Sequence, residues 1–123
     1  MDIRRVRASE GGPLRELRLR ALLDAPGAFL ASYRDEVKEP PSWCDDLANQ
    51  SEEGRDGAIF IAASDECWIA MAGGYTRRDQ PGVVTVWGMW VDPHAGRRGI
   101  GRRLLDAIAE WARAIGASRL SSR

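Results

Sequence analysis

A run of nine residues, Val83 to Val91, constrains the fold of this chain more than any other segment. Neither face of an extended strand here would be polar, because apolar residues occupy both odd and even positions: Val83, Val84, Val86, Trp87, Met89, Trp90 and Val91. Such a strand is covered on both faces, which predicts helices on both sides of a sheet. Gly88 interrupts the run, and an interior glycine often marks a bulge or the close approach of another group.

The segments around this strand predict the other elements. Short strands are expected over residues 3–7, 58–63 and 67–75, and another begins near residue 117. Helices are expected from a cap at Ser9 to Pro26-Gly27, over residues 28–30, and over residues 42–50 with Trp43 and Leu47 facing inward. A last helix ends at Gly116 and carries one apolar stripe: Leu104, Ile108, Trp111, Ala112 and Ile115. Residues 33–41 are expected to form a polar loop.

This order of elements predicts the α+β class, with a mixed, mostly antiparallel sheet flanked by helices. The length of 123 residues suits one domain. Cys44 and Cys67 form no zinc motif, and a lone His94 argues against a metal site. No apolar run has the length of a signal peptide core or a membrane span, so we expect a cytoplasmic protein with reduced thiols.

Charge is balanced overall and segregated along the chain. Eighteen basic and eighteen acidic residues give a net charge of zero, which argues against binding to nucleic acid or to an anionic membrane. Residues 35–66 hold two basic and ten acidic residues, whereas residues 67–123 hold nine basic and four acidic ones. The acidic segment could attract a cationic substrate or could be a solubilising loop.

The segment after the long strand carries the strongest chemical signal. Glycines in the turn let backbone approach a ligand, and the start of the following helix presents unpaired N–H groups that suit phosphate. Four arginines surround this turn: Arg97, Arg98, Arg102 and Arg103. A solvated basic surface is the alternative. A Walker loop is excluded because no Gly-Lys-Ser/Thr follows, and Leu104 occupies the third glycine position of a dinucleotide motif.

Three motifs together resemble the core of the GCN5-related N-acetyltransferases: Gly-Met-Trp-Val-Asp-Pro at 88–93, Arg-Arg-Gly-Ile-Gly-Arg-Arg-Leu-Leu at 97–105, and Trp-Ala-Arg-Ala-Ile-Gly-Ala at 111–117. Residues 17–22, Pro26-Gly27-Ala28-Phe29 and Trp43 resemble the acceptor-side helices of one bacterial branch. The resemblance implies one domain with an acceptor side at 1–57, central strands, pyrophosphate loop and helix at 58–116, and the start of a fifth strand at 117–123.

By this resemblance the cosubstrate is acetyl-CoA, and the acceptor is a primary amine of a small molecule or a protein. The positions that match the pantetheine and pyrophosphate contacts are Met89, Trp90, Val91, Arg97, Arg98, Gly99, Ile100, Gly101 and Arg102. Two features depart from the family pattern. Gly96 stands where the loop usually has Arg or Gln, and the chain ends at Arg123, where further strands and a helix usually follow.

No residue is assigned a catalytic role from the sequence. The long strand has no acidic residue to act as a base, and the acids of the middle segment, Glu36 and Glu39, are expected to be solvated loop charges. His94 is expected to lie at the surface or to contact the cosubstrate. Tyr33 and Tyr75 could each donate a proton, although Tyr75 is expected to pack in the sheet. The remaining candidates are expected to serve packing more than chemistry: Trp87, Trp90, Cys44 and Cys67.

Three functions from different classes remain open at this level. The first is acetyl-CoA-dependent N-acetyltransfer. The second is a non-catalytic acyl-CoA-binding module or an inactive, truncated remnant, suggested by Gly96 and the short C-terminal part. The third is a structural or partner-binding domain. An open sheet edge would favour self-association, so a homo-oligomer is expected.

Overall fold

Five strands form one mixed sheet in this computed structural model, which describes residues 1–25, 32–95 and 98–122. The strands lie in the order of the sequence: β1 (Asp2–Arg5), β2 (Gly57–Ser64), β3 (Cys67–Arg77), β4 (Gln80–Val91) and β5 (Arg119–Ser122). Neighbours are antiparallel except for β4 and β5, which are parallel and joined by a helical crossover. The predicted mixed, mostly antiparallel sheet is confirmed.

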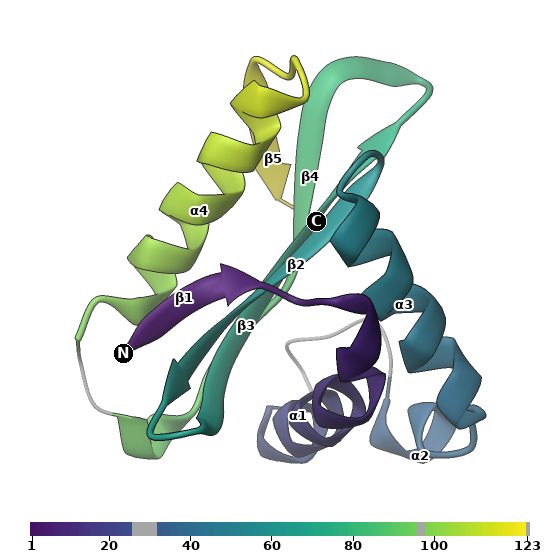
Figure 1. Ribbon diagram of the computed structural model, residues 1–123, viewed down its shortest axis with the longest axis vertical. Helices are drawn as coiled ribbons and strands as arrows, with labels where there is room; N and C mark the ends of the chain where they lie inside the picture. Colours follow the sequence, from purple (N-terminus) through teal and green to yellow (C-terminus); the bar gives the residue numbers. More distant parts are fainter. Residues whose placement is uncertain (26–31, 96–97, 123) are drawn as a thin grey trace.

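Helices cover both faces of the sheet (Figure 1). On one face lie α1 (Gly11–Asp24), α2 (Tyr33–Glu36) and α3 (Pro41–Glu53), and on the other lies α4 (Ile100–Ala114). Two short 3-10 turns, η1 (Ala8–Glu10) and η3 (Pro93–Ala95), complete the described elements. The core is divided by the sheet into one apolar cluster under α4 and another under α1 and α3. Coverage of both faces agrees with the apolar character of β4.

The periodicity of α4 was sufficient to predict its buried face. Leu104, Ile108, Trp111 and Ala112 are buried against the sheet, and Ile115 packs at the edge of the same cluster. The indole N–H of Trp111 donates to the carbonyl oxygen of Gly54 at 2.8 Å, so the aromatic group is buried with its polar atom satisfied.

The N-terminal half differs from the sequence expectation in three details. Ser9 lies within η1, and α1 begins after it at Gly11. The expected loop at 33–41 contains α2, whose cap is Ser32, because the Ser32 hydroxyl accepts the N–H of Asp35 at 3.2 Å. The most deeply buried residues of α3 are Cys44, Ala48 and Ser51, whereas the expected Leu47 is half-buried against the same core cluster and Trp43 is half-buried. The expected helix at residues 28–30 lies outside the described residues.

Within the described ranges, no helix combines the length and the apolar character that crossing a membrane requires.

Candidate active site

A β-bulge divides β4 into two halves. Met71 on β3 pairs with Trp90, whereas Gly73 pairs with Trp87, so three steps along β4 match two along β3. The additional residue falls at Gly88–Met89, and Gly88 has φ +63°, a left-handed conformation that a glycine adopts without a steric cost. The bulge predicted from Gly88 is confirmed. Because of the extra residue, both Trp87 and Trp90 face α1 and α3.

The two halves of β4 have different neighbours on the β5 side. β5 pairs with Val83 to Val86 and with no later residue of β4. From Trp87 to Val91 the outer edge of β4 therefore has no strand partner in the described part of the chain. Met89 and Val91 are half-buried there, and Trp90 is buried on the α1 side. An unpaired edge of this kind offers backbone N–H and C=O groups to an extended ligand that contains amides.

The start of α4 lies beside this open edge. Gly99 has φ +66° and precedes the helix without a side-chain cap. The N–H groups of Ile100, Gly101 and Arg102 consequently have no intrahelical acceptor, because the first such bond runs from Arg103 to Gly99 at 3.1 Å. A methyl group on Gly101 would lie 3.7 Å from Met89 Sδ, which places this turn directly against β4.

Arginines surround the helix start as expected from the sequence. Arg98 is exposed, and its Nε donates to the Ala95 carbonyl oxygen at 3.0 Å. Arg102 is also exposed and contacts Asp106 at 3.2 Å. Gly96 and Arg97 lie outside the described residues. The described groups combine N–H donors without an intrahelical acceptor, the positive end of a helix dipole and exposed guanidinium groups, a set that binds phosphate.

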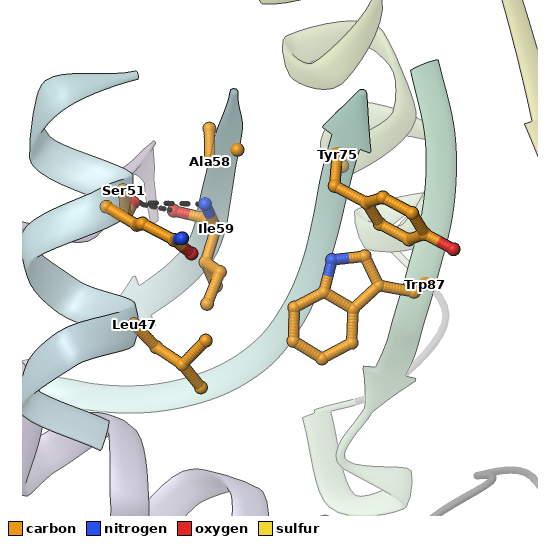
Figure 2. Close-up of a pocket in the computed structure, with 9 residues that line it drawn as sticks. Leu47, Ser51, Ala58, Ile59, Tyr75 and Trp87 are labelled. Atoms are coloured by element: carbon orange, nitrogen blue, oxygen red, sulfur yellow. Dashed lines mark hydrogen bonds between the residues drawn. The ribbon is translucent and has the colours of Figure 1, made fainter. Parts of the chain in front are cut away.

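A pocket of about 340 Å³ lies on the opposite side of β4, between α3 and the sheet (Figure 2). Leu47 and Ser51 of α3 form one wall, and Tyr75 of β3 and Trp87 of β4 lie across from them. The Ser51 hydroxyl contacts both the N–H and the carbonyl oxygen of Ile59, at 3.0 and 3.2 Å, which fixes α3 against β2. The volume of the pocket falls within the usual range for a small-molecule site.

Next to the pocket, a buried ion pair supports Trp87. Arg18 of α1 donates to both carboxylate oxygens of Glu36, at 2.7 and 3.0 Å, and the two side chains are 5% and 4% exposed. The Arg18 guanidinium also lies over the rings of Trp43, at 5.4 Å, and of Trp87, at 5.0 Å. The expectation that Glu36 is a solvated loop charge is wrong, since α2 turns this carboxylate inward.

A second polar cluster joins α1 to the end of β4. The Trp90 indole N–H donates to Asp24 at 2.9 Å, and Arg20 pairs with Asp92 at 3.0 Å. The pKa of Asp92 is held below its usual value, mainly because its carboxylate accepts the backbone N–H of His94. Hydrogen bonds from the His94 ring and from Arg20 lower it further. The His94 side chain is 95% exposed, so the expected surface position of this residue is confirmed.

The other candidates from the sequence are dispersed. Glu39 and Cys67 are exposed, and Tyr33 is half-buried on α2. Cys44 is buried in the α3 face, and burial raises the pKa of its thiol, as expected for an inert group. In the described ranges no three His, Cys, Asp or Glu side chains are arranged to hold a metal ion. Arg18 is the residue that sequence reasoning missed, because its partners lie 18 to 69 positions away.

Solved acetyltransferases share this fold. The superposition on a GNAT acetyltransferase from Streptococcus pneumoniae has a TM-score of 0.80 at 17% identity, covering 98% of this chain and 72% of that one. Aminoglycoside N-acetyltransferase AAC(6')-Iy, solved with the bisubstrate analog CoA-S-monomethyl-acetylneamine, gives 0.73 at 23% identity, covering 99% and 78%. Ribosomal-protein-alanine N-acetyltransferase from Brucella melitensis biovar Abortus 2308 gives 0.69 at 17%, covering 99% and 78%.

The sequence itself identifies the family. No curated protein is significantly similar to the chain. The family profile described as "Acetyltransferase (GNAT) family" matches residues 18–122, which include the bulged strand, the glycine turn and the helix after it. The chain therefore belongs to the acetyltransferase (GNAT) family, whose reaction is the acetyl-CoA-dependent N-acetylation of an amine.

Proposed function

We propose that this protein acetylates a primary amine of a small molecule or a protein, with acetyl-CoA bound along the outer edge of β4. The observation that carries this proposal is the position of the uncapped α4 N-terminus beside the unpaired half of β4. The two features together match a ligand with a diphosphate at one end and an amide-containing arm at the other. Members of the same fold have been solved with CoA or with a CoA-linked analog.

Each proposed contact has a distinct physical role. The N–H groups of Ile100, Gly101 and Arg102 donate hydrogen bonds to the pyrophosphate. Gly99 lets the backbone approach it closely. Positive charge is added by Arg97, Arg98 and Arg102. Backbone groups of Met89, Trp90 and Val91 pair with the amides of the pantetheine arm.

The transfer step needs few catalytic side chains. When bound, acetyl-CoA supplies an activated thioester. A backbone N–H near Val91 would donate to the thioester carbonyl oxygen and so favour attack by a neutral amine. The amine nitrogen would form the new C–N bond as the C–S bond breaks, and the departing thiolate would take up, through water, the proton that the nitrogen loses. The strand Val83–Val91 itself contains no carboxylate that could act as the base. The α1–α3 side of β4, where Trp87 and the pocket lie, receives the acceptor.

Two measurements test this proposal. The melting temperature should rise when acetyl-CoA is added, because a ligand at about 100 times its Kd adds about 2.7 kcal/mol to the free energy of unfolding. Release of free CoA thiol should then depend on added amine. Arg98→Gln with Arg102→Gln should weaken acetyl-CoA binding about tenfold, because two positive charges leave the phosphate site.

The matched control removes two arginines elsewhere. Arg113 and Arg119 are exposed and lie past the middle of α4 and on β5, so Arg113→Gln with Arg119→Gln should leave binding unchanged. Saturable binding with no thiol release across an amine panel would contradict catalysis. Equal loss of binding in both double variants would contradict the assigned phosphate site.

We also propose that the protein self-associates in the cytoplasm. In support, Leu120 on β5 is 39% exposed, and β5 pairs on one side only among the described strands. Sedimentation should show a dimer or larger species at micromolar concentration. A stable, monodisperse monomer would contradict this assignment.

A further inference from the structure

We propose that the pocket between α3 and the sheet binds the body of the acceptor, and that it selects a primary amine with an uncharged, apolar body over a polycationic amine. The inference rests on the proposed function and names the substrate class of that site. Nine of the described residues line the pocket: Leu47, Gln50, Ser51, Gly57, Ala58, Ile59, Gly74, Tyr75 and Trp87.

The position of Trp87 orients the acceptor in the pocket. Trp87 is the first residue of the unpaired half of β4, so the Trp87 end of the pocket is nearest the proposed thioester. The lining residues from α3 are Leu47, Gln50 and Ser51, and Figure 2 shows Leu47 and Ser51 across from Trp87. An amine that reacts at the Trp87 end therefore extends its body toward α3.

The chemistry of the lining sets the charge of that body. None of the nine lining residues is an acid or a base of the Asp, Glu, Lys, Arg or His type. A second ammonium group on the body would lose water and find no carboxylate there, and an unpaired buried charge is strongly unfavourable. Apolar groups would instead contact Leu47, Ile59 and the indole of Trp87.

The ion pair behind Trp87 does not change this balance. Arg18 carries a positive charge toward the Trp87 ring at 5.0 Å, but Glu36 neutralises it through two hydrogen bonds. Trp87 is held from another direction by the sheet, since a Cβ on Gly73 would lie 2.5 Å from the indole nitrogen. The aromatic wall is thus rigid and carries no net charge, which suits an apolar group.

A matched amine pair measures the selectivity directly. Hexylamine and 1,6-diaminohexane have the same carbon chain and differ in one terminal amino group. In calorimetric titrations of the protein saturated with CoA, which carries no acetyl group to transfer, hexylamine should bind at least tenfold more tightly than 1,6-diaminohexane. In the thiol-release assay, kcat/KM should favour hexylamine by a similar factor.

Two isosteric variants then locate the effect. Gln50 is exposed at the pocket wall, so Gln50→Glu adds a carboxylate there without changing the packing. It should shift the binding ratio about tenfold toward the diamine, because the second ammonium gains a partner. Asn49→Asp makes the same change of charge on an exposed neighbour outside the lining, and it should leave the ratio within about twofold.

A size change provides an independent check. A methyl group on Gly57 would meet the Gly74 carbonyl oxygen at 3.6 Å and Gln50 Oε1 at 4.0 Å, which are ordinary contacts with two lining residues. The Gly57→Ala variant should therefore fold normally, and its added methyl group should occupy part of the pocket. Binding of 2-phenylethylamine should weaken several-fold while that of ethylamine stays unchanged.

The outcomes separate this inference from the proposed function. Tighter binding of the diamine, or equal shifts in Gln50→Glu and Asn49→Asp, would overturn the pocket assignment even if acetyl transfer proceeds. Selective binding of hexylamine with no thiol release from any amine would overturn the proposed catalysis and support the pocket's selectivity.

Discussion

Replacing Glu36 with glutamine removes one charge from a buried pair and keeps the shape of the side chain. Arg18 would then remain 5% exposed, without a counter-ion, between the rings of Trp43 and Trp87. Breaking a buried ion pair by removing one partner costs about 3–5 kcal/mol. That is a large part of the roughly 5–15 kcal/mol that stabilises a typical domain.

The lower stability of Glu36→Gln should appear in the melting temperature, and the change beside Trp87 should appear in the KM for the amine. For a chain of this length about 1 kcal/mol changes Tm by about 4 °C, so Glu36→Gln should lower Tm by roughly 12–20 °C. Urea denaturation should give the matching change in the free energy of unfolding. Trp87 would also lose a fixed neighbour, so the KM for an amine acceptor should rise more than kcat falls.

Two further variants decide whether burial of the charge is the cause. Arg18→Met with Glu36→Leu removes both charges and fills the space with apolar groups, which should recover most of the lost stability. Asp79→Asn breaks the Arg77–Asp79 pair, whose side chains are 49% and 63% exposed, and should leave the free energy of unfolding nearly unchanged. Equal losses in Glu36→Gln and Asp79→Asn would refute the reasoning.

Three other positions give separate expectations. Ser51→Ala should lower the free energy of unfolding in urea by about 1–3 kcal/mol, because the buried N–H of Ile59 loses its acceptor. Gly88→Ala should cost about 1 kcal/mol at φ +63° and also weaken acetyl-CoA binding in titrations, if the bulge opens the β4 edge. Hydrogen bonds from Arg4 hold the pKa of Glu10 below its usual value. The stabilisation from Glu10 is therefore complete above the unfolded value of about 4.3 and is lost as pH falls through the lower folded value. In urea titrations the free energy of unfolding of the native chain should exceed that of Glu10→Gln by a constant amount from pH 6 to 8, and this difference should decrease below about pH 4.

Sequence reasoning succeeded where a short segment determines its own structure. The bulge at Gly88, the apolar face of α4 and the uncapped glycine turn at Gly99 depend on residues within a few positions of one another. A local pattern of glycines and apolar side chains is then sufficient to predict them. The family resemblance extends the same local motifs to acetyl-CoA, and the family assignment confirms it.

Sequence reasoning failed where distant segments determine the environment of a side chain. Glu36 reads as a loop charge because its neighbours in sequence are polar, whereas its buried position follows from Arg18 on α1. Leu47 packs against the core as expected, yet the most deeply buried positions of α3 are Cys44, Ala48 and Ser51, because the tight contact with the sheet selects small side chains. Close packing favours small side chains that no propensity indicates.

The acidic middle segment shows why the charge of a segment does not give the charge of a ligand. Ten acidic residues lie between positions 35 and 66, and none of them lines the pocket. Glu36 is neutralised by Arg18, and Glu52 accepts the backbone N–H of Ala8 at 3.2 Å. Exposed carboxylates act at long range on how fast a cation arrives, and salt screens them. The uncharged lining acts at contact distance on which amine stays bound, so the selection that we propose for the pocket does not depend on steering by the acidic segment.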